Sequence, residues 1–274
     1  ASQIANQVRF KIDTVVIASM ISATSVTYYA VGLRLVEYFS DLLFRATNLM
    51  TPVFTRYWVQ GRHEEIREKL LLLTRINAIL GVFGGGVILI VGKAFILRWM
   101  GDEFAVSYPV LAVLMIAIVA DFIGCPADNI FFAMAKHPYL AVINIMEGVL
   151  NLALSLSLAR PFGIVGVAVG TALPLVFFRL TVLPYYITRF VGLPLRKYYW
   201  NLFPTIAFTL AYLGGFFLLT RKILAVPSYR TVVAVGVLAL PLYGLAMPFV
   251  SFSKEERQYF RSLLPSGLGF RSRP

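Results

Sequence analysis

The chain has 274 residues, of which 59% are hydrophobic and only 14% are charged, and its formal net charge is +12. Soluble domains are about 45–50% apolar and about 25% charged, so this composition excludes an ordinary soluble domain and indicates a polytopic membrane protein. The basic excess lies in the links between apolar segments and in the tail. It therefore does not predict nucleic acid as a partner.

Eight apolar segments are long enough to cross a bilayer, which takes about 20 residues. The sequence predicts an all-α, polytopic membrane protein with about eight transmembrane helices. The predicted spans are 4–22, 26–55, 70–92, 105–134, 139–159, 164–188, 199–220 and 230–250.

The second predicted span contains four charges at helical spacings of three, four and four: Arg34, Glu37, Asp41 and Arg45. All four fall within an arc of about 80° on one helix face. A charge that faces lipid costs at least ~2.5 kcal/mol, so this face must meet protein or water. We expect it to line a cavity. The alternative is structural, with Arg34 paired to Glu37 and Asp41 paired to Arg45.

Between spans two and three lies the largest hydrophilic link, residues 56–69, whose last six residues are predicted to form a short exposed helix. In span four, Pro126 stands beside Cys125 and two residues before Asp128. Because proline removes a helix hydrogen bond, this point is either a hinge or a static bend.

Polar residues also recur on shared faces of the later spans, which predicts a common wet interior. Carboxylates inside a membrane are common H⁺ or Na⁺ sites, so Asp41, Asp128 and Glu147 are candidate ion-coupling residues, with structural pairing as the alternative. The polar residues are Arg75 and Asn77 in the third span, Asp121 and Asp128 in the fourth, Asn144, Glu147, Asn151 and Ser155 in the fifth, and Arg179 in the sixth.

The distribution of Lys and Arg in the links predicts the topology. An excess of these residues marks the cytoplasmic side, and thirteen lie on one side against six on the other. We therefore expect an inner (cytoplasmic) membrane protein with both termini in the cytoplasm. The inner set is Arg56, Arg62, Arg67, Lys69, Lys136, Arg189, Arg196, Lys197, Lys254, Arg257, Arg261, Arg271 and Arg273, and the outer set is Lys93, Arg98, Arg160, Arg221, Lys222 and Arg230.

Little in the sequence favours catalysis. Cys125 is the only cysteine, and both histidines, His63 and His137, fall in links without a partner at metal-ligand spacing. No Walker A motif is present, and no Ser/His/Asp arrangement can be built with both histidines in links. The sequence therefore predicts neither an enzyme nor a metal or cofactor site.

Residues 144–174, NIMEGVLNLALSLSLARPFGIVGVAVGTALP, resemble the polysaccharide-biosynthesis (O-antigen, lipopolysaccharide) flippases of the MATE-like exporter superfamily. The shared elements are an Asn in a helix, a Leu-rich run, a basic-Pro-x-Gly-Ile turn and a small-residue helix start. Upstream, Phe10-Lys-Ile-Asp13 and the segment 25–32 resemble the helix pair that opens the second lobe of that family. The resemblance covers most of residues 3–264.

The resemblance implies a carrier that flips a polyprenyl-pyrophosphate-linked oligosaccharide across the membrane by alternating access. Residues 1–190 would be the second six-helix lobe, 191–252 two additional helices and 253–274 a cytoplasmic tail. The first lobe is expected to be absent, so this segment by itself should not transport. Arg34, Arg45, Arg75, Arg179, Asn144 and Asn151 would bind the substrate, with H⁺ or Na⁺ as the coupling ion at Asp41, Asp128 or Glu147.

The implied partners are the lipid-linked oligosaccharide, membrane lipids and polysaccharide-assembly proteins. Two alternatives remain at this stage. One is a drug or metabolite cation antiporter of the same superfamily, and the other is a non-transporting membrane scaffold.

Overall fold

The structure, a computed structural model, describes residues 2–47, 50–224 and 228–251, and within these ranges it is helical without any strand. This confirms the predicted all-α class. The tail expected at 253–274 lies outside the described residues. The elements are α1 (Ser2–Met20), α2 (Ala23–Thr47), α3 (Thr51–Val59), α4 (His63–Met100), η2 (Asp102–Val106), α5 (Ser107–Ala133), α6 (His137–Phe177), η3 (Phe178–Val182), α7 (Leu183–Val191), α8 (Leu195–Thr220) and α9 (Tyr229–Ser251).

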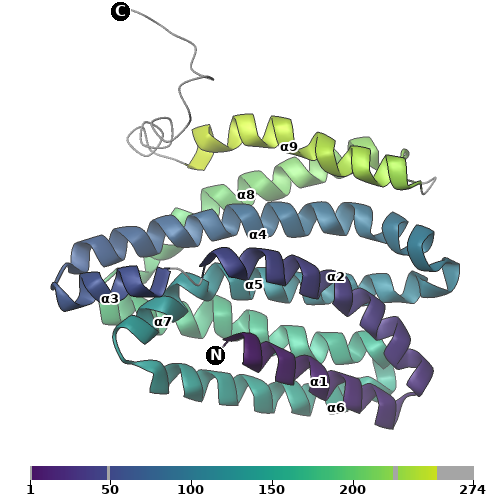
Figure 1. Ribbon diagram of the computed structural model, residues 1–274, viewed down its shortest axis with the longest axis horizontal. Helices are drawn as coiled ribbons and strands as arrows, with labels where there is room; N and C mark the ends of the chain where they lie inside the picture. The colour runs from purple at the N-terminus through teal and green to yellow at the C-terminus, as the bar shows by residue number, and fades with distance from the viewer. Residues whose placement is uncertain (1, 48–49, 225–227, 252–274) are drawn as a thin grey trace, which may run out of the picture.

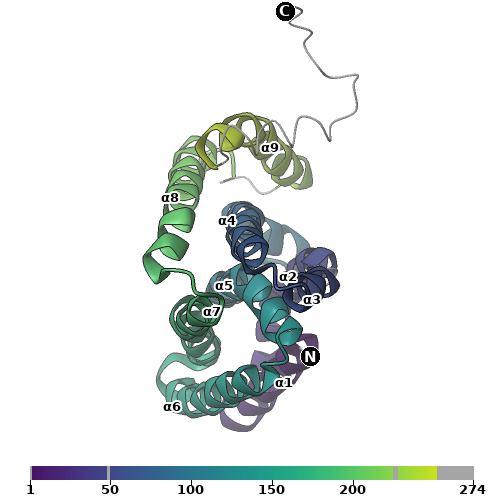
Figure 2. The same ribbon diagram turned by 90° about the vertical axis from the view of Figure 1, so that its left-hand side faces the viewer.

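The long helices run side by side along the long axis of the molecule (Figure 1). α5 lies at the centre and packs against α2, α4 and α6, which explains why most of its residues from Val110 to Phe131 are buried. α8 and α9 pack on the outer side of α4, away from α1 and α6 (Figure 2). The division at residue 190 into a lobe and two additional helices stays a prediction.

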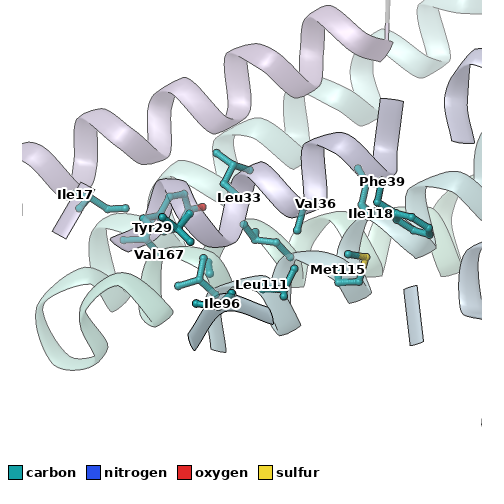
Figure 3. Packing of buried hydrophobic residues seen from close by; sticks show 14 of the residues in the cluster. Ile17, Tyr29, Leu33, Val36, Phe39, Ile96, Leu111, Met115, Ile118 and Val167 are labelled. Carbon is teal, nitrogen blue, oxygen red and sulfur yellow. The ribbon is translucent and has the colours of Figure 1, made fainter. Parts of the chain in front are cut away.

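Apolar side chains from α1, α2, α4, α5 and α6 form a common core (Figure 3). We refer to the helices from α1 to α7 as the lobe. α2 contributes Leu33, Val36 and Phe39 to it. Val36 and Phe39 lie on the side of α2 opposite to its charged residues, because a helix turns by about 100° per residue. The apolar face of α2 therefore fixes the direction in which the charges point.

Five stretches of the described chain are long and apolar enough to cross a membrane: His63–Met100, Asp102–Ala133, His137–Val191, Leu195–Thr220 and Tyr229–Pro248. The third has 55 residues, far more than the ~20 that one crossing needs. α1 and α2 do not meet this criterion, so eight crossings stay a prediction.

The third stretch is broken at Gly163, whose φ of 59° and ψ of −143° are not helical. The two halves of α6 then run back along each other, with Ser155 Oγ donating to the carbonyl of Val167 at 3.3 Å. A Cβ at Gly170 would collide with Ser155, so glycine allows this close approach. The turn lies between the predicted spans 139–159 and 164–188.

Two sequence predictions about the first half of the chain are wrong. The span expected at 26–55 is not one helix, since α2 ends at Thr47 and α3 begins at Thr51. Pro52 lies in the first turn of α3, where its missing N–H costs no helix hydrogen bond. Residues 64–69 are not a separate short helix but the first turns of the 38-residue α4, because nothing in the sequence interrupts the helix before the apolar run.

The links fall into two groups at opposite ends of the lobe. Arg67 Nε donates to the carbonyl of Val191 at 2.6 Å, which joins the first turns of α4 to the end of α7. At the other end of α4, the Arg98 guanidinium lies 5.3 Å from the ring centre of Tyr229. This grouping agrees with the sides assigned from Lys and Arg, while the orientation stays a prediction.

Cysteine labelling tests the orientation. We expect Lys222→Cys to react with a membrane-impermeant maleimide added to spheroplasts, and Glu68→Cys to react only after lysis. Both positions are exposed, and the native Cys125 is buried and provides a quiet background. Labelling of Glu68→Cys from outside, with Lys222→Cys protected, would show that the orientation is the opposite of the predicted one.

Candidate functional site

A buried ion-pair cluster is centred on Arg179, which is 3% exposed. Its Nε lies 2.7 Å from Asp121 Oδ1, close enough for an ion pair although the N–H is not directed for a hydrogen bond. Nη1 donates to both carboxylate oxygens of Asp128 at 3.2 and 3.3 Å. Nη2 donates to Asn144 Oδ1 at 3.4 Å. The guanidinium thus joins η3 to α5 and α6.

Glu147, fully buried one turn after Asn144, adds a third carboxylate whose charge acts on Asp128 and Arg179. The structure thus brings together four residues that the sequence predicted for the site, Arg179, Asn144, Asp128 and Glu147. It adds Asp121, which the sequence placed only on the same helix face as Asp128. Their roles in transport stay predictions.

Irregular helix geometry positions Arg179. It lies in η3, a π-helical turn, and such turns are frequent at functional sites. Pro184 follows in the first turn of α7 and has no N–H to donate to the preceding turn. The hydroxyl of Tyr199, on α8, donates to the carbonyl of Leu180 at 2.6 Å. The irregular segment is thereby held in place by a neighbouring helix.

A side chain from a neighbouring helix replaces the backbone hydrogen bond that Pro126 removes inside α5. Pro126 cannot donate to the carbonyl of Phe122, and the side-chain amide of Asn77 on α4 donates to it at 2.8 Å instead. α5 continues as an α-helix through Pro126. In this conformation Pro126 is accommodated within the helix, and Asn77 has the role of replacing its missing hydrogen bond.

The charged face of α2 lies on the surface of the described chain. The side chains of Arg34 and Glu37 are 63% and 34% exposed, and they form an ion pair of 2.9 Å. Asp41 and Arg45 are also exposed. In the part of the chain that the structure describes, no ion pair joins these two residues, although their spacing allows one. Only the first of the two pairs expected from the sequence is therefore present.

A second buried cluster surrounds Asp13, which is fully buried on α1. The hydroxyl of Tyr29 donates to its Oδ2 at 2.7 Å. The hydroxyl of Thr171 lies 2.8 and 2.7 Å from its two oxygens. Sequence analysis missed this cluster because its partners are 16 and 158 residues away along the chain; the only local signal was an acid at the start of an apolar run.

We expect Thr171→Val to lower the free energy of unfolding by about 1–3 kcal/mol, because the carboxylate of Asp13 stays buried and loses a donor. The melting temperature in detergent should fall by several degrees. Thr181→Val is the matched control, since its exposed hydroxyl bonds only to the carbonyl of Phe177 in its own helix. Equal melting of both variants would show that Asp13 does not depend on this donor.

The two remaining predicted site residues lie elsewhere. Arg75 is partly buried on α4, between the buried Thr74 and Asn77. Asn151 is buried on α6, one turn after Glu147 and one turn before Ser155. The polar face predicted for this helix is therefore turned into the lobe rather than toward lipid.

Comparison with known proteins gives one informative relative. No protein-family model matches the chain. An uncharacterized membrane protein of Bacillus subtilis (strain 168), EpsK, is 22% identical over 263 residues, which cover 90% of this chain and 49% of EpsK. The chain thus spans about half the length of this relative. The similarity and the apolar helices support a polytopic membrane protein.

Proposed function

We propose that this chain is a lobe of an ion-coupled carrier that flips a polyprenyl-pyrophosphate-linked oligosaccharide across the cytoplasmic membrane for cell-surface polysaccharide synthesis. The observation that carries the proposal is the uncovered charged face of α2. Arg34, Asp41 and Arg45 are exposed on a helix whose other face is packed into the core of a membrane protein.

Such a face cannot lie against hydrocarbon. The penalty of at least ~2.5 kcal/mol for each charge would far exceed what one exposed ion pair returns, which is about 0–1 kcal/mol. The charges therefore require water or other protein beside them. We infer that α2 forms one wall of an aqueous cavity, and that protein outside these residues forms the opposite wall.

The residues on this wall suit an anionic ligand. A guanidinium is planar and binds phosphate oxygens through two parallel N–H donors. Arg34 and Arg45 lie three helical turns apart, about 16 Å along the axis. We assign Arg45, which has no carboxylate partner on its own helix, to the pyrophosphate. Arg34, Arg75, Arg179, Asn144 and Asn151 remain further candidates for contacts with the substrate.

The Arg179 cluster supports ion coupling. It gathers three buried carboxylates, those of Asp121, Asp128 and Glu147, around one guanidinium. Carboxylates inside a membrane are common sites for H⁺ or Na⁺, and uptake of either ion would change the charge of the cluster. Because the cluster joins α5, α6 and η3, its charge state would alter the force that holds these elements together.

The test is deletion of the gene from its own genome. We expect the deletion strain to lose surface polysaccharide and to accumulate the lipid-linked oligosaccharide on the cytoplasmic leaflet, and the intact gene to restore both. A cation antiporter is the second candidate, because Glu37 and Asp41 share the exposed face. Normal polysaccharide and increased sensitivity to cationic drugs in the deletion strain would favour the antiporter. An unchanged phenotype in both assays would favour a scaffold.

A further inference from the structure

Basic residues near the ends of α6, α7 and α8 form a group that we call the basic belt. It lies at the end of the lobe that carries the Arg67–Val191 contact, which the Lys/Arg distribution assigns to the cytoplasm. Arg189, Arg196 and Lys197 are exposed, and Lys136 is partly exposed. The members of the basic belt are Lys136, Arg189, Arg196 and Lys197.

Three of these cations lie on aromatic rings. Lys136 Nζ lies 3.5 Å from the ring centre of Phe190, and the guanidinium carbons of Arg189 and Arg196 lie 5.0 and 6.0 Å from the rings of Tyr185 and Trp200. Cation–π contacts hold the positive groups in place. Unlike an ion pair with a carboxylate, a cation–π contact does not neutralise the positive charge.

Aromatic side chains beside these cations are exposed on the outside of the lobe. Tyr139, Tyr185 and Trp200 are 47%, 43% and 57% exposed, and Tyr139 packs edge-on against Phe190 at 5.1 Å between ring centres. Exposed Tyr and Trp next to bases are typical of the level of the lipid headgroups. The basic belt therefore lies where a membrane protein meets phosphates.

Among the described residues, no ion pair joins a carboxylate to the basic belt. Between residues 129 and 251 the only acid is Glu147, and it is fully buried in the lobe. The beginning of α4, at the same end, is different. There Arg62, just before the helix, pairs with Glu65 at 2.7 Å, and Arg67 pairs with Glu64 at 2.6 Å. The charges of these four residues therefore balance one another.

We propose that the basic belt is a binding surface for anionic phospholipid headgroups of the cytoplasmic leaflet. The aromatic rings contact the glycerol and upper acyl region, and the cations contact the phosphates. Charge complementarity selects this occupant, because the basic belt has four positive charges, lies against exposed aromatic rings and forms no ion pair with a carboxylate of the described chain. Each base near an anionic surface contributes about fivefold in affinity.

The experiment measures lipid retained by the purified chain, by native mass spectrometry in detergent. The probes are phosphatidylglycerol and phosphatidylcholine with identical acyl chains. We expect preferential retention of phosphatidylglycerol, and at least a tenfold loss of its apparent affinity in the triple variant Lys136→Gln, Arg189→Gln, Arg196→Gln. The matched control removes three bases from the opposite end: Arg98→Gln, Arg221→Gln, Lys222→Gln. It should bind phosphatidylglycerol like the unaltered chain.

Equal retention of the two lipids, or equal losses in the two triple variants, would overturn the proposal. If the basic-belt variant does not fold, the three single variants replace it, and the unaltered chain is compared at low and high salt. A preference for phosphatidylglycerol that salt does not weaken would also overturn it, because the attraction to phosphates must be screened. Polyprenyl pyrophosphate is added in a separate arm. Binding of that lipid with no preference for phosphatidylglycerol would assign the surface to the transported substrate instead.

Discussion

Arg179→Gln is expected to destabilise the protein by about 3–5 kcal/mol, because it removes the guanidinium that contacts the buried carboxylates of Asp121 and Asp128. Arg179 is 3% exposed and contacts both carboxylates, so little water can replace it. Thermal melting in detergent, followed by size-exclusion chromatography, measures the loss. Arg160→Gln is the control, because it removes the same side chain from an exposed position.

The neutralised cluster separates structure from coupling. Arg179→Gln combined with Asp121→Asn and Asp128→Asn removes the guanidinium together with both carboxylate charges that it contacts. This triple variant should recover most of the lost stability. If the cluster couples transport to an ion, the recovered protein should fold and insert yet lose the dependence of transport on pH or Na⁺. A recovered protein with unchanged ion dependence would reduce the cluster to a structural role. An Arg179→Gln variant that melts like Arg160→Gln would contradict the ion pairs themselves.

Transport is expected to fall at least about tenfold in the double variant Asp41→Asn, Arg45→Gln, while the protein stays folded and inserted. Both residues are exposed and no ion pair joins them, so the change breaks no contact seen in the structure. A hydrogen bond to a charged group contributes about 1.5–3 kcal/mol, and a factor of ten corresponds to about 1.4 kcal/mol. Loss of a pyrophosphate ligand at Arg45 would therefore exceed tenfold.

The substitutions are made in the gene at its own locus, so that the whole protein carries them, and surface polysaccharide and protein level are both measured. Arg45→Lys should restore only part of the transport, because lysine cannot form the bidentate contact. The control is Arg62→Gln with Glu65→Gln, a surface ion pair at the beginning of α4. Normal polysaccharide in the Asp41/Arg45 double variant would show that the charged face of α2 does not bind the substrate.

The sequence by itself determined the class of the protein and the grouping of residues on helix faces. Hydropathy marked the apolar helices, and spacings of three and four placed Arg34, Glu37, Asp41 and Arg45 on one side of α2. Residues near Gly163 predicted the turn that divides α6. These features are local, because helical periodicity and glycine conformation depend on residues within a few positions of each other.

Only the tertiary structure decided which face is covered and which distant residues meet. It placed Arg179 between Asp121 and Asp128, more than 50 residues earlier, and turned Thr171 toward Asp13. It also left the charged face of α2 open, where the sequence allowed two self-contained ion pairs. Such outcomes depend on how whole helices pack around α5, and no spacing along the chain encodes the distance between side chains on different helices.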